Sequence, residues 1–181
     1  RVDRRQRQMC IRDSISGLHL GKVIEINNDP LKQNRLKVQI PIISDKNKGI
    51  WAKLSHLFTS KNGGSFIIPE IGSQVVVSFI ANDPRNPVIL GTLYNNQFNP
   101  RYSIKKNNNI KSLTTKSNLV LEFDENEKKI TSSSPRGNKI VINEKSKEVI
   151  ITDENKNSIS TSPTGIDIES KKNVSIFSRG N

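Results

Sequence analysis

Short runs in which apolar and polar side chains alternate constrain this chain more than any other feature of its sequence. In residues 35–43, for example, Leu36, Val38, Ile40 and Ile42 are separated by single residues that are mostly polar. A period of two residues is typical of a β-strand with one buried face. No stretch of the sequence has a convincing helical period. We therefore expect an all-β protein.

Residues 15–99 are predicted to form a barrel domain. The strand-like runs are 18–27, 35–43, 51–58, 65–68, 74–80 and 88–94, separated by segments that favour turns. Short antiparallel strands at this density favour a small closed barrel, because closure removes the exposed sheet edges. The apolar residues available to fill it are Val23, Leu36, Val38, Ile40, Trp51, Leu54, Phe66, Val75, Val77, Phe79, Ile89 and Leu93.

Residues 100–117, rich in Lys and Asn, are predicted to be a linker, and the composition changes after it. Residues 101–181 contain 21 apolar residues in 81 positions and no Ala, Cys, Met or Trp. Ordering the backbone costs about 1–2 kcal/mol per residue. So few apolar residues cannot stabilise an independent globular core.

The apolar residues of 118–181 nevertheless form a repeat. Asn118, Asn138 and Asn157 each open a strand-like run, twenty and nineteen residues apart. The second apolar positions of these units are Ile130, Ile150 and Ile166. Units of this length cannot bury their apolar face alone, so they stack within one chain or wind with other chains around a common axis.

We favour three chains around one narrow core, because each strand offers only two or three apolar residues. The predicted architecture is therefore a five-stranded barrel followed by a trimeric β-prism, an intertwined β-helix, over residues 118–181. A disordered tail rich in Lys, Asn and Ser is the alternative. Disorder does not explain the repeated alternation.

The first fourteen residues are set apart from this interpretation. Residues 4–13 (RRQRQMCIRD) can be encoded by ten consecutive codons that resemble a transposase adapter used to prepare sequencing libraries. We interpret residues 1–14 as translated adapter, not native sequence; the alternative is a natural basic arm that contacts nucleic acid. The only Cys and the only Met lie in this segment, so the cysteine count says nothing about redox compartment.

The positive charge is spread along the chain and does not form a stripe. The formal net charge is +12, and without residues 1–14 it is 24 minus 15, or +9. Nucleic-acid sites cluster their basic residues and interleave aromatic ones for stacking. The aromatic residues of the barrel domain fall mostly at positions that a core would claim: Trp51, Phe58, Phe66, Phe79 and Tyr94. We expect no nucleic-acid partner; a barrel that binds single-stranded nucleic acid is the alternative function.

No residue pattern points to catalysis or to a cofactor. His19 and His56 are the only histidines, and neither stands in a metal-ligand spacing. No G-x-S-x-G nucleophile motif is present. Glu70 and Asp83 could be imagined as paired carboxylates, but both lie in turn motifs with a structural explanation. We predict no enzyme activity and no catalytic, cofactor-binding or metal-binding residues.

Several segments together resemble valine-glycine repeat protein G, the spike of type VI secretion systems, and the related central spike of contractile phage tails. The segments that carry the resemblance in the barrel are 21–23 (GKV), 35–41 (RLKVQIP), 51–53 (WAK), 69–75 (PEIGSQV) and 83–95 (DPRNPVILGTLYN). Residues 110–117 (IKSLTTKS) resemble the link into the family's β-prism. The resemblance implies a barrel of the oligonucleotide/oligosaccharide-binding (OB) type.

The resemblance also implies a function and partners. A homotrimer would pierce target membranes and carry effectors, with a tail-tube or hub protein below the barrel and a tip protein or effector beyond the prism. Contact with the target membrane would be transient. Such a spike is assembled in the bacterial cytoplasm and secreted through the injection apparatus, or it is part of a phage virion. Because the family carries a hub region before the barrel, we expect a truncated piece of a longer protein.

Overall fold

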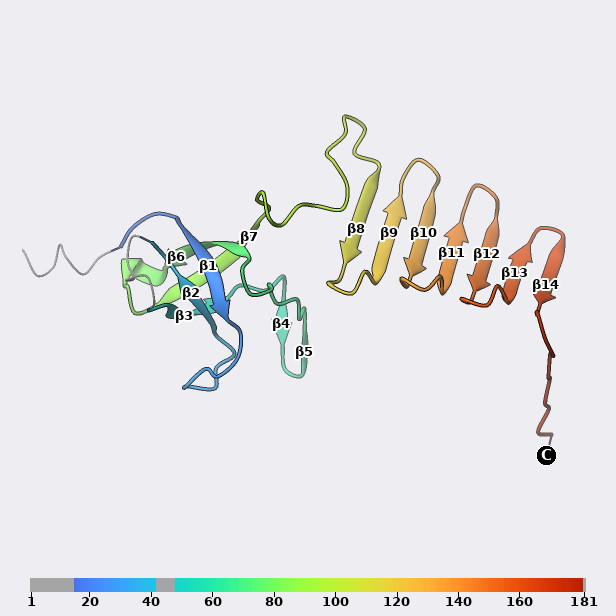
Figure 1. Ribbon diagram of the computed structural model, residues 1–181, viewed down its shortest axis with the longest axis horizontal. Helices are drawn as coiled ribbons and strands as arrows, with labels where there is room; N and C mark the ends of the chain where they lie inside the picture. Colours follow the sequence, from blue (N-terminus) through green and yellow to red (C-terminus); the bar gives the residue numbers. More distant parts are fainter. Residues whose placement is uncertain (1–14, 42–47, 181) are drawn as a thin grey trace, which may run out of the picture. The chain divides into compact units, whose positions relative to one another are not determined.

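Both halves of the chain are built from β-strands (Figure 1). The computed structural model describes residues 15–41 and 48–180, and the chain divides into two units after Pro100. Within those ranges the only helical element is a 3-10 turn at Ile80–Asn82. The predicted all-β class is confirmed. Residues 1–14, for which we predict an adapter origin, lie outside the described residues, as do residues 42–47.

The first unit is a closed five-stranded barrel with the strand order β1-β2-β3-β7-β6. Its strands are β1 (His19–Glu25), β2 (Leu36–Gln39), β3 (Ile50–Leu54), β6 (Gln74–Phe79) and β7 (Pro87–Leu93). Neighbouring strands are antiparallel except β3 and β7, which pair in parallel, and β6 pairs with β1 to close the ring. A short hairpin of β4 (Thr59–Ser60) and β5 (Gly63–Gly64) lies between β3 and β6.

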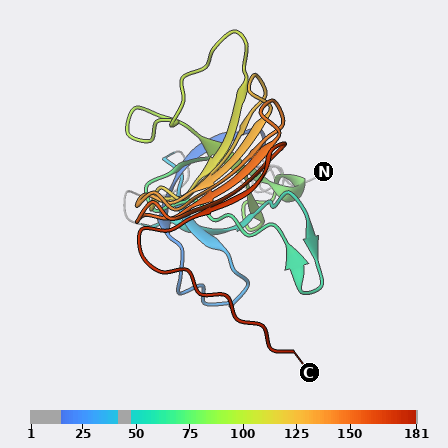
Figure 2. The same ribbon diagram turned by 90° about the vertical axis from the view of Figure 1, so that its right-hand side faces the viewer.

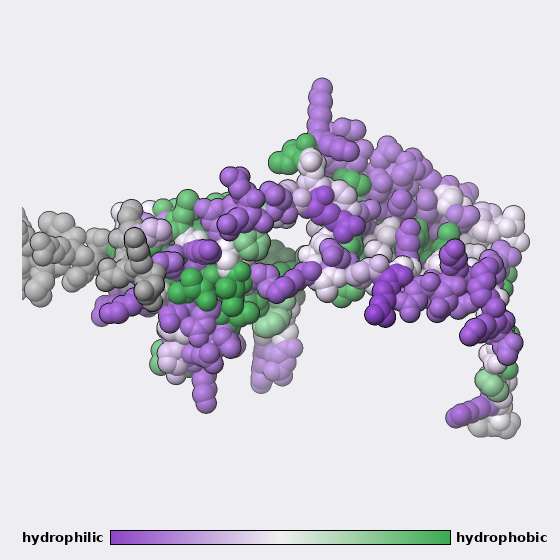
Figure 3. All heavy atoms as spheres, in the orientation of Figure 1, coloured by the Kyte–Doolittle hydropathy of each residue, from purple (hydrophilic) through white to green (hydrophobic). Residues whose placement is uncertain are grey.

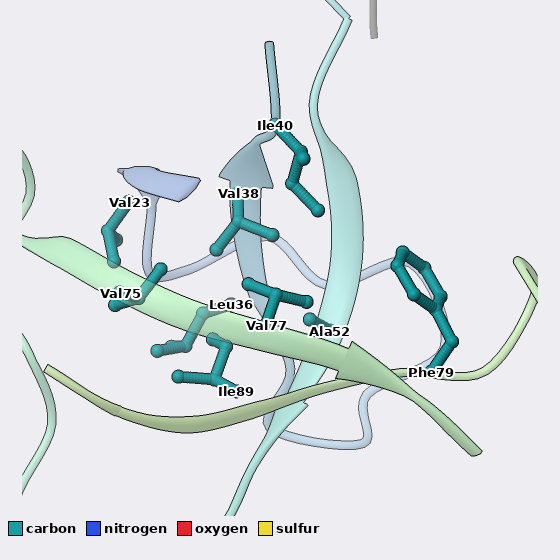
Figure 4. Close-up of a cluster of buried hydrophobic side chains, with 9 residues drawn as sticks. All are labelled: Val23, Leu36, Val38, Ile40, Ala52, Val75, Val77, Phe79 and Ile89. Carbon is teal, nitrogen blue, oxygen red and sulfur yellow. The ribbon is translucent and has the colours of Figure 1, made fainter. Parts of the chain in front are cut away.

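Alternate side chains of the barrel strands point inward and form its core (Figure 4). The buried residues are Val23, Leu36, Val38, Ile40, Ala52, Val75, Val77, Phe79 and Ile89. Eight of these nine were predicted from the alternation, and Ala52 was not, because a small residue gives a weak apolar signal. Leu54 packs against the core from a partly buried position.

Three residues that were predicted to be in the barrel core lie outside it. Phe66 is 82% exposed, because the chain leaves the barrel after β3 and residues 65–68 form no strand. Leu93 is 46% exposed at the end of β7. Trp51 is half-buried on β3, and the Lys37 ammonium lies 5.7 Å from its ring centroid. Their strand-like sequence context did not reveal which way these side chains face.

A β-bulge bends the barrel next to Gly91. Val76 pairs with Gly91 while Val77 pairs with Ile89, so Leu90 is an extra residue on β7. Glycine is common at such bulges, where the strand bends. The bulge lets β6 follow β7 around the curve of the barrel.

The second unit is a single antiparallel sheet of seven strands in sequence order. They are β8 (Ile110–Thr114), β9 (Val120–Asp124), β10 (Lys129–Ser133), β11 (Lys139–Asn143), β12 (Glu148–Thr152), β13 (Ser158–Ser162) and β14 (Gly165–Glu169). Figure 2 shows these strands one behind another, with a gradual twist. The sheet begins at β8, inside the segment that we predicted to be a linker.

Tight turns with a left-handed residue join the strands of the sheet. On one side of the sheet these residues are Asn118, Gly137 and Lys156, spaced 19 residues apart. On the other side they are Lys128, Lys147 and Gly165. A two-strand unit of about 19 residues therefore repeats, in agreement with the spacing of Asn118, Asn138 and Asn157. Each of these three asparagines lies just before an odd-numbered strand of the sheet.

Candidate interaction surface

One face of the sheet carries an array of mainly apolar side chains, which we call the apolar face. The strand register places its residues in two rows. Row one is Leu113, Leu121, Ser132, Ile140, Ile151, Ile159 and Ile168. Row two is Lys111, Phe123, Ile130, Ile142, Val149, Thr161 and Ile166. Neighbours along a row come from adjacent strands and are direct cross-strand partners, the pairs that stabilise a sheet.

The apolar face is open in a single chain. Its apolar side chains are between 39% exposed, at Ile130, and 71% exposed, at Ile166. An apolar array of this extent on a soluble protein marks an interaction site. The sheet is thus a folded element whose apolar side has not been removed from water.

The opposite face of the sheet is mainly polar, but a few of its side chains are buried. Val120, Thr131 and Val141 are each at most 9% exposed on this face. Ile150 is also there, opposite Val141 and half-buried, so the prediction that Ile150 is equivalent to Ile130 is wrong. The equivalent residue is Val149, one position earlier. Figure 3 shows one side of this unit, where hydrophilic residues predominate.

Hydrogen bonds from backbone N–H groups fix the turns at the edges of the sheet. The Asp124 carboxylate accepts hydrogen bonds from the backbone N–H groups of Asn126 and Glu127, each at 3.0 Å. Asn143 Oδ1 accepts from the N–H groups of Lys145 and Ser146 in the equivalent turn, and Asp153 accepts from those of Asn155 and Asn157 at the other edge. Successive turns are also connected: Asn138 Oδ1 accepts from the Glu154 N–H at 3.1 Å, and Asn157 Oδ1 from the Lys171 N–H at 2.9 Å.

Residues 101–109 return to the sheet ahead of β8. The Tyr102 hydroxyl donates a hydrogen bond to the Glu122 carboxylate on β9, which raises the pKa of Tyr102. The Arg101 guanidinium lies 5.8 Å from the Tyr102 ring centroid. These contacts fix the start of the sheet from its polar face.

In the barrel, carboxylate–arginine pairs organise two loops. Between β1 and β2, Asp29 binds the Arg35 guanidinium, with an oxygen–nitrogen distance of 2.6 Å. Asp29 also accepts from the backbone N–H groups of Leu31, Gln33 and Arg35. The Arg35 hydrogen bond, with these backbone bonds, holds the pKa of Asp29 well below its usual range. The sequence signal that could have predicted this ion pair is an Asp in a turn-forming segment followed by an Arg six residues later.

The loop between β6 and β7 uses the same chemistry. Asp83 accepts hydrogen bonds from the Arg85 backbone N–H and from its guanidinium, both at 2.9 Å. The Arg85 side chain lowers the pKa of Asp83, and Asn86 contributes a further hydrogen bond. Two left-handed residues, Ala81 and Asn82, precede it. The Asp-Pro-Arg-Asn-Pro motif is thus a rigid loop, as its two prolines suggest.

The histidines and carboxylates considered for catalysis lie in packing contacts and turns of the barrel. The His19 ring packs edge-on against Phe79, with centroids 5.7 Å apart, and its Nε2 lies 3.1 Å from the Ser16 carbonyl oxygen. His56 is half-buried after β3. Glu70 is in the turn that Gly72 completes, and Asp83 is beyond the other end of β6, so the structure does not pair these carboxylates. Across residues 15–41 and 48–180, no group of three His, Cys, Asp or Glu side chains could hold a metal ion.

The aromatic residues of the barrel are more exposed than predicted. Phe79 is in the core and Trp51 is half-buried, but Phe58, Phe66 and Tyr94 are largely exposed. Leu57 and Ile67 are exposed beside the β4–β5 hairpin as well. Figure 3 shows hydrophobic residues gathered on one side of the barrel unit. An open groove of about 550 Å³ also lies over β1, lined mainly by polar side chains that include Lys22, Gln39 and Gln74.

No helix among the described residues has the length and apolar character needed to cross a membrane.

Known proteins are similar in sequence to the barrel region. Residues 19–94, which span β1 to β7, match the family described as the type VI secretion system/phage-baseplate injector OB domain. The type VI secretion system spike protein VgrG1a of Pseudomonas aeruginosa is 35% identical over 85 residues, 45% of this chain and 13% of that protein. The spike protein VgrG3 of Vibrio cholerae is 26% identical over 92 residues, 47% of this chain and 9% of that protein.

A third relative has a different name. The actin cross-linking toxin VgrG1 of Vibrio cholerae is 26% identical over 98 residues, 52% of this chain and 9% of that protein. The matched part is therefore between 9% and 13% of the length of these relatives. The family match and the closed OB-type barrel agree on the same residues. Residues 19–94 thus match the type VI secretion system/phage-baseplate injector OB domain in sequence and in fold, and this part of the chain is similar to VgrG spike proteins.

Proposed function

We propose that three copies of this chain wrap their apolar faces around one axis and form part of the spike of a contractile injection machine. The open apolar face is the observation that carries the proposal. A single-layer sheet with an apolar side needs a second layer to be stable in water. Three identical sheets supply that layer to one another and form a prism with a narrow apolar core.

A trimeric prism suits mechanical work. Each sheet has continuous cross-strand hydrogen bonding from β8 to β14, and local opening would require one copy to separate from the other two. A spike of this kind is driven through a target membrane by sheath contraction, so its contact with lipid is transient. The task needs rigidity and no catalytic residues.

The partners follow from this role. A tail-tube or hub protein would lie below the barrel, and a tip protein or effector beyond the prism. Assembly would take place in the bacterial cytoplasm before secretion, or within a phage virion. The relatives named as spike proteins support this placement through the barrel.

Light scattering and hydrogen exchange on the purified chain test the assembly. We expect the mass of three copies and protection of amides in β9 to β13. A monomer whose residues 110–169 exchange freely would contradict the proposal. Matched measurements at increasing dilution should show that protection in the sheet falls as the oligomer dissociates.

A chimera tests the role in injection. Residues 19–169 would replace the matching region and the segment that follows it in Pseudomonas aeruginosa VgrG1a, and release of tail-tube protein into the medium would be measured. We expect release with the chimera and none with the chimera carrying Ile151→Asp. A trimeric chimera that supports no release would argue against a spike function.

Single-stranded nucleic acid is the second candidate ligand, because Phe58, Phe66 and Tyr94 are exposed on a basic OB-type barrel. Stacking on aromatic side chains is how such barrels bind single strands. Fluorescence anisotropy with a labelled oligothymidine would test it. Salt-dependent binding below micromolar concentrations that is lost in Phe66→Ala would favour this function over the spike.

A further inference from the structure

A hollow interrupts the apolar face at Ser132. Ser132 is the only small polar residue in row one, where it lies between its cross-strand partners Leu121 and Ile140. The hollow has a volume of about 410 Å³. On the apolar face its lining comes from Leu113, Leu119, Leu121 and Ile140, and polar residues that include Thr115, Ser134 and Asn138 line it as well. A hollow with apolar walls accommodates an apolar side chain well.

The largest side chain of the apolar face is in the other row. Phe123 is the only aromatic residue of either row, and it is on β9, one strand before Ser132. It is 41% exposed in the single chain. Within one chain Phe123 is opposite Ile130, so it does not fill the hollow beside Ser132. Row one therefore has a side chain that is too small at Ser132, and row two has a large side chain one strand away at Phe123.

The two lateral edges of the sheet carry complementary charges. Edge one, next to row one, has the turns 115–118, 134–138 and 153–157, with formal charges of +1, +1 and −1. Edge two, next to row two, has the turns 124–128 and 143–147, with charges of −2 and +1. In a parallel arrangement, each edge-two turn falls between two edge-one turns of the next copy. Three of these four contacts then join turns of opposite formal charge, which weakly favours that pairing because Glu125 and Glu127 already pair with Lys111 and Lys145 in their own chain.

We propose that Phe123 of each copy occupies the hollow beside Ser132 of the next copy, so that the copies associate parallel and in register. The inference rests on the proposed trimer and names the contact that sets its register. Around a three-fold axis, edge two of one copy meets edge one of its neighbour, which brings row two against row one. Phe123 then lies within one strand spacing, about 4.8 Å, of the level of Ser132.

Disulfide trapping tests this contact in the full chain. Two differently tagged chains, both carrying Cys10→Ser, would be co-expressed, one with Phe123→Cys and the other with Ser132→Cys. Because a disulfide needs Cα atoms within about 7 Å, oxidation should yield a covalent dimer that carries both tags. The pair Glu122→Cys with Thr131→Cys, on the opposite face, is the matched control and should stay uncrosslinked.

A second pair of variants reports the register. Phe123→Cys with Ile151→Cys places the thiols three strands apart along the axis, about 14 Å if the copies are in register. Cross-linking of this pair, or a trimer by light scattering without the 123–132 cross-link, would overturn the inference and leave the proposed trimer intact. A monomer by light scattering would overturn both.

A size exchange measures the same contact without disulfides. Ser132→Phe should raise the concentration of half-assembly by about tenfold or more, because two large side chains then compete for one space. The exchange Phe123→Ser with Ser132→Phe should bring it back to within about threefold of the native value. Equal weakening in the single and the exchanged chain would contradict direct contact.

Discussion

The strands of the barrel and of the sheet have the same alternation of apolar and polar residues. The barrel buries its apolar side chains within a single chain, whereas the sheet leaves them exposed. In the barrel, Val23, Val75 and Ile89 are fully buried. In the sheet, Ile140 and Ile151 are both 47% exposed. Alternation specifies a strand with one apolar side. It does not specify what covers that side.

Curvature makes the difference. The barrel strands are bent by the bulge at Leu90 and by a register shift in β1, so that β6 meets β1 and the sheet covers itself. In the sheet unit, hairpins of nearly equal length keep all seven strands in one layer. The first unit therefore supplies its own core, and the second supplies one wall of a core that several copies share.

The largest effect is expected from a charge on the apolar face. Ile151→Asp should abolish the oligomer, because assembly would bury an unpaired carboxylate, which costs several kcal/mol. Light scattering would measure the mass. Ser160→Asp, on the opposite face of β13, is the matched control and should leave the oligomer intact. Oligomers that tolerate Ile151→Asp would show that this face is not the interface.

A cavity in the barrel core should lower the stability of the barrel without affecting assembly of the chains. Ile89→Ala is expected to lower the free energy of unfolding of the barrel by about 2–5 kcal/mol. Trp51, the single tryptophan, is on β3 and reports barrel unfolding by its fluorescence. The unfolding midpoint of the barrel should not depend on protein concentration. The unfolding midpoint of the sheet, measured by circular dichroism, should depend on it. If both midpoints shifted together on dilution, the two units would not be independent.

A smaller effect is expected at the turn that leads into β6. Gly72 has φ +94°, and an added Cβ would lie 3.2 Å from the Phe98 ring. Gly72→Ala should therefore destabilise the barrel by about 1–2 kcal/mol. Gly91→Ala is the control, because nothing lies within 4 Å of an added Cβ there. Equal denaturation midpoints for the two variants would contradict the role of the Gly72 turn.

The smallest effect is pH-dependent and confined to the barrel. The folded-state pKa of Asp29 is depressed by Arg35, so its stabilising contribution is present above its unfolded pKa of about 3.9 and is lost as the pH falls through the folded value. Asp29→Asn should lower the melting temperature of the barrel at pH 7. The difference from the native chain should narrow below about pH 4.

An exposed carboxylate of the sheet serves as the control for that titration. Asp167→Asn on β14 should leave the Trp51-detected melting curve unchanged at every pH. A difference between Asp29→Asn and the native chain that stays constant from pH 7 to pH 2 would mean that the carboxylate charge does not stabilise the loop.

Much of the barrel could be predicted from residue types alone. Val23, Val38, Val75 and Val77 were assigned to the core, because β-branched residues at every second position have few other places in a strand. Turn residues also marked the loops around Gly72 and Asp83. Phe66 was misplaced, because its apolar character does not reveal that the chain has already left the barrel wall.

The interaction surface was predicted in outline and corrected in detail. The sparse repeat after residue 118 indicated strands that need partners, and the open apolar face agrees with that expectation. Ile150 was assigned to the wrong face, because adjacent Val149, Ile150 and Ile151 are all apolar and the alternation is lost there. The hollow at Ser132 depends on which strands are neighbours, and no local pattern contains that information.

By itself, the sequence determined the strands, the turns and the scarcity of apolar residues in the second half, since these follow from local periodicity and composition. Only the tertiary structure decided that β3 and β7 pair in parallel, that the predicted barrel closes between β6 and β1, and that both rows of the sheet lie on one open face. The physical reason is that register and closure depend on contacts between residues far apart in the chain. A two-residue period is the same whether a strand ends up in a barrel or in an open sheet.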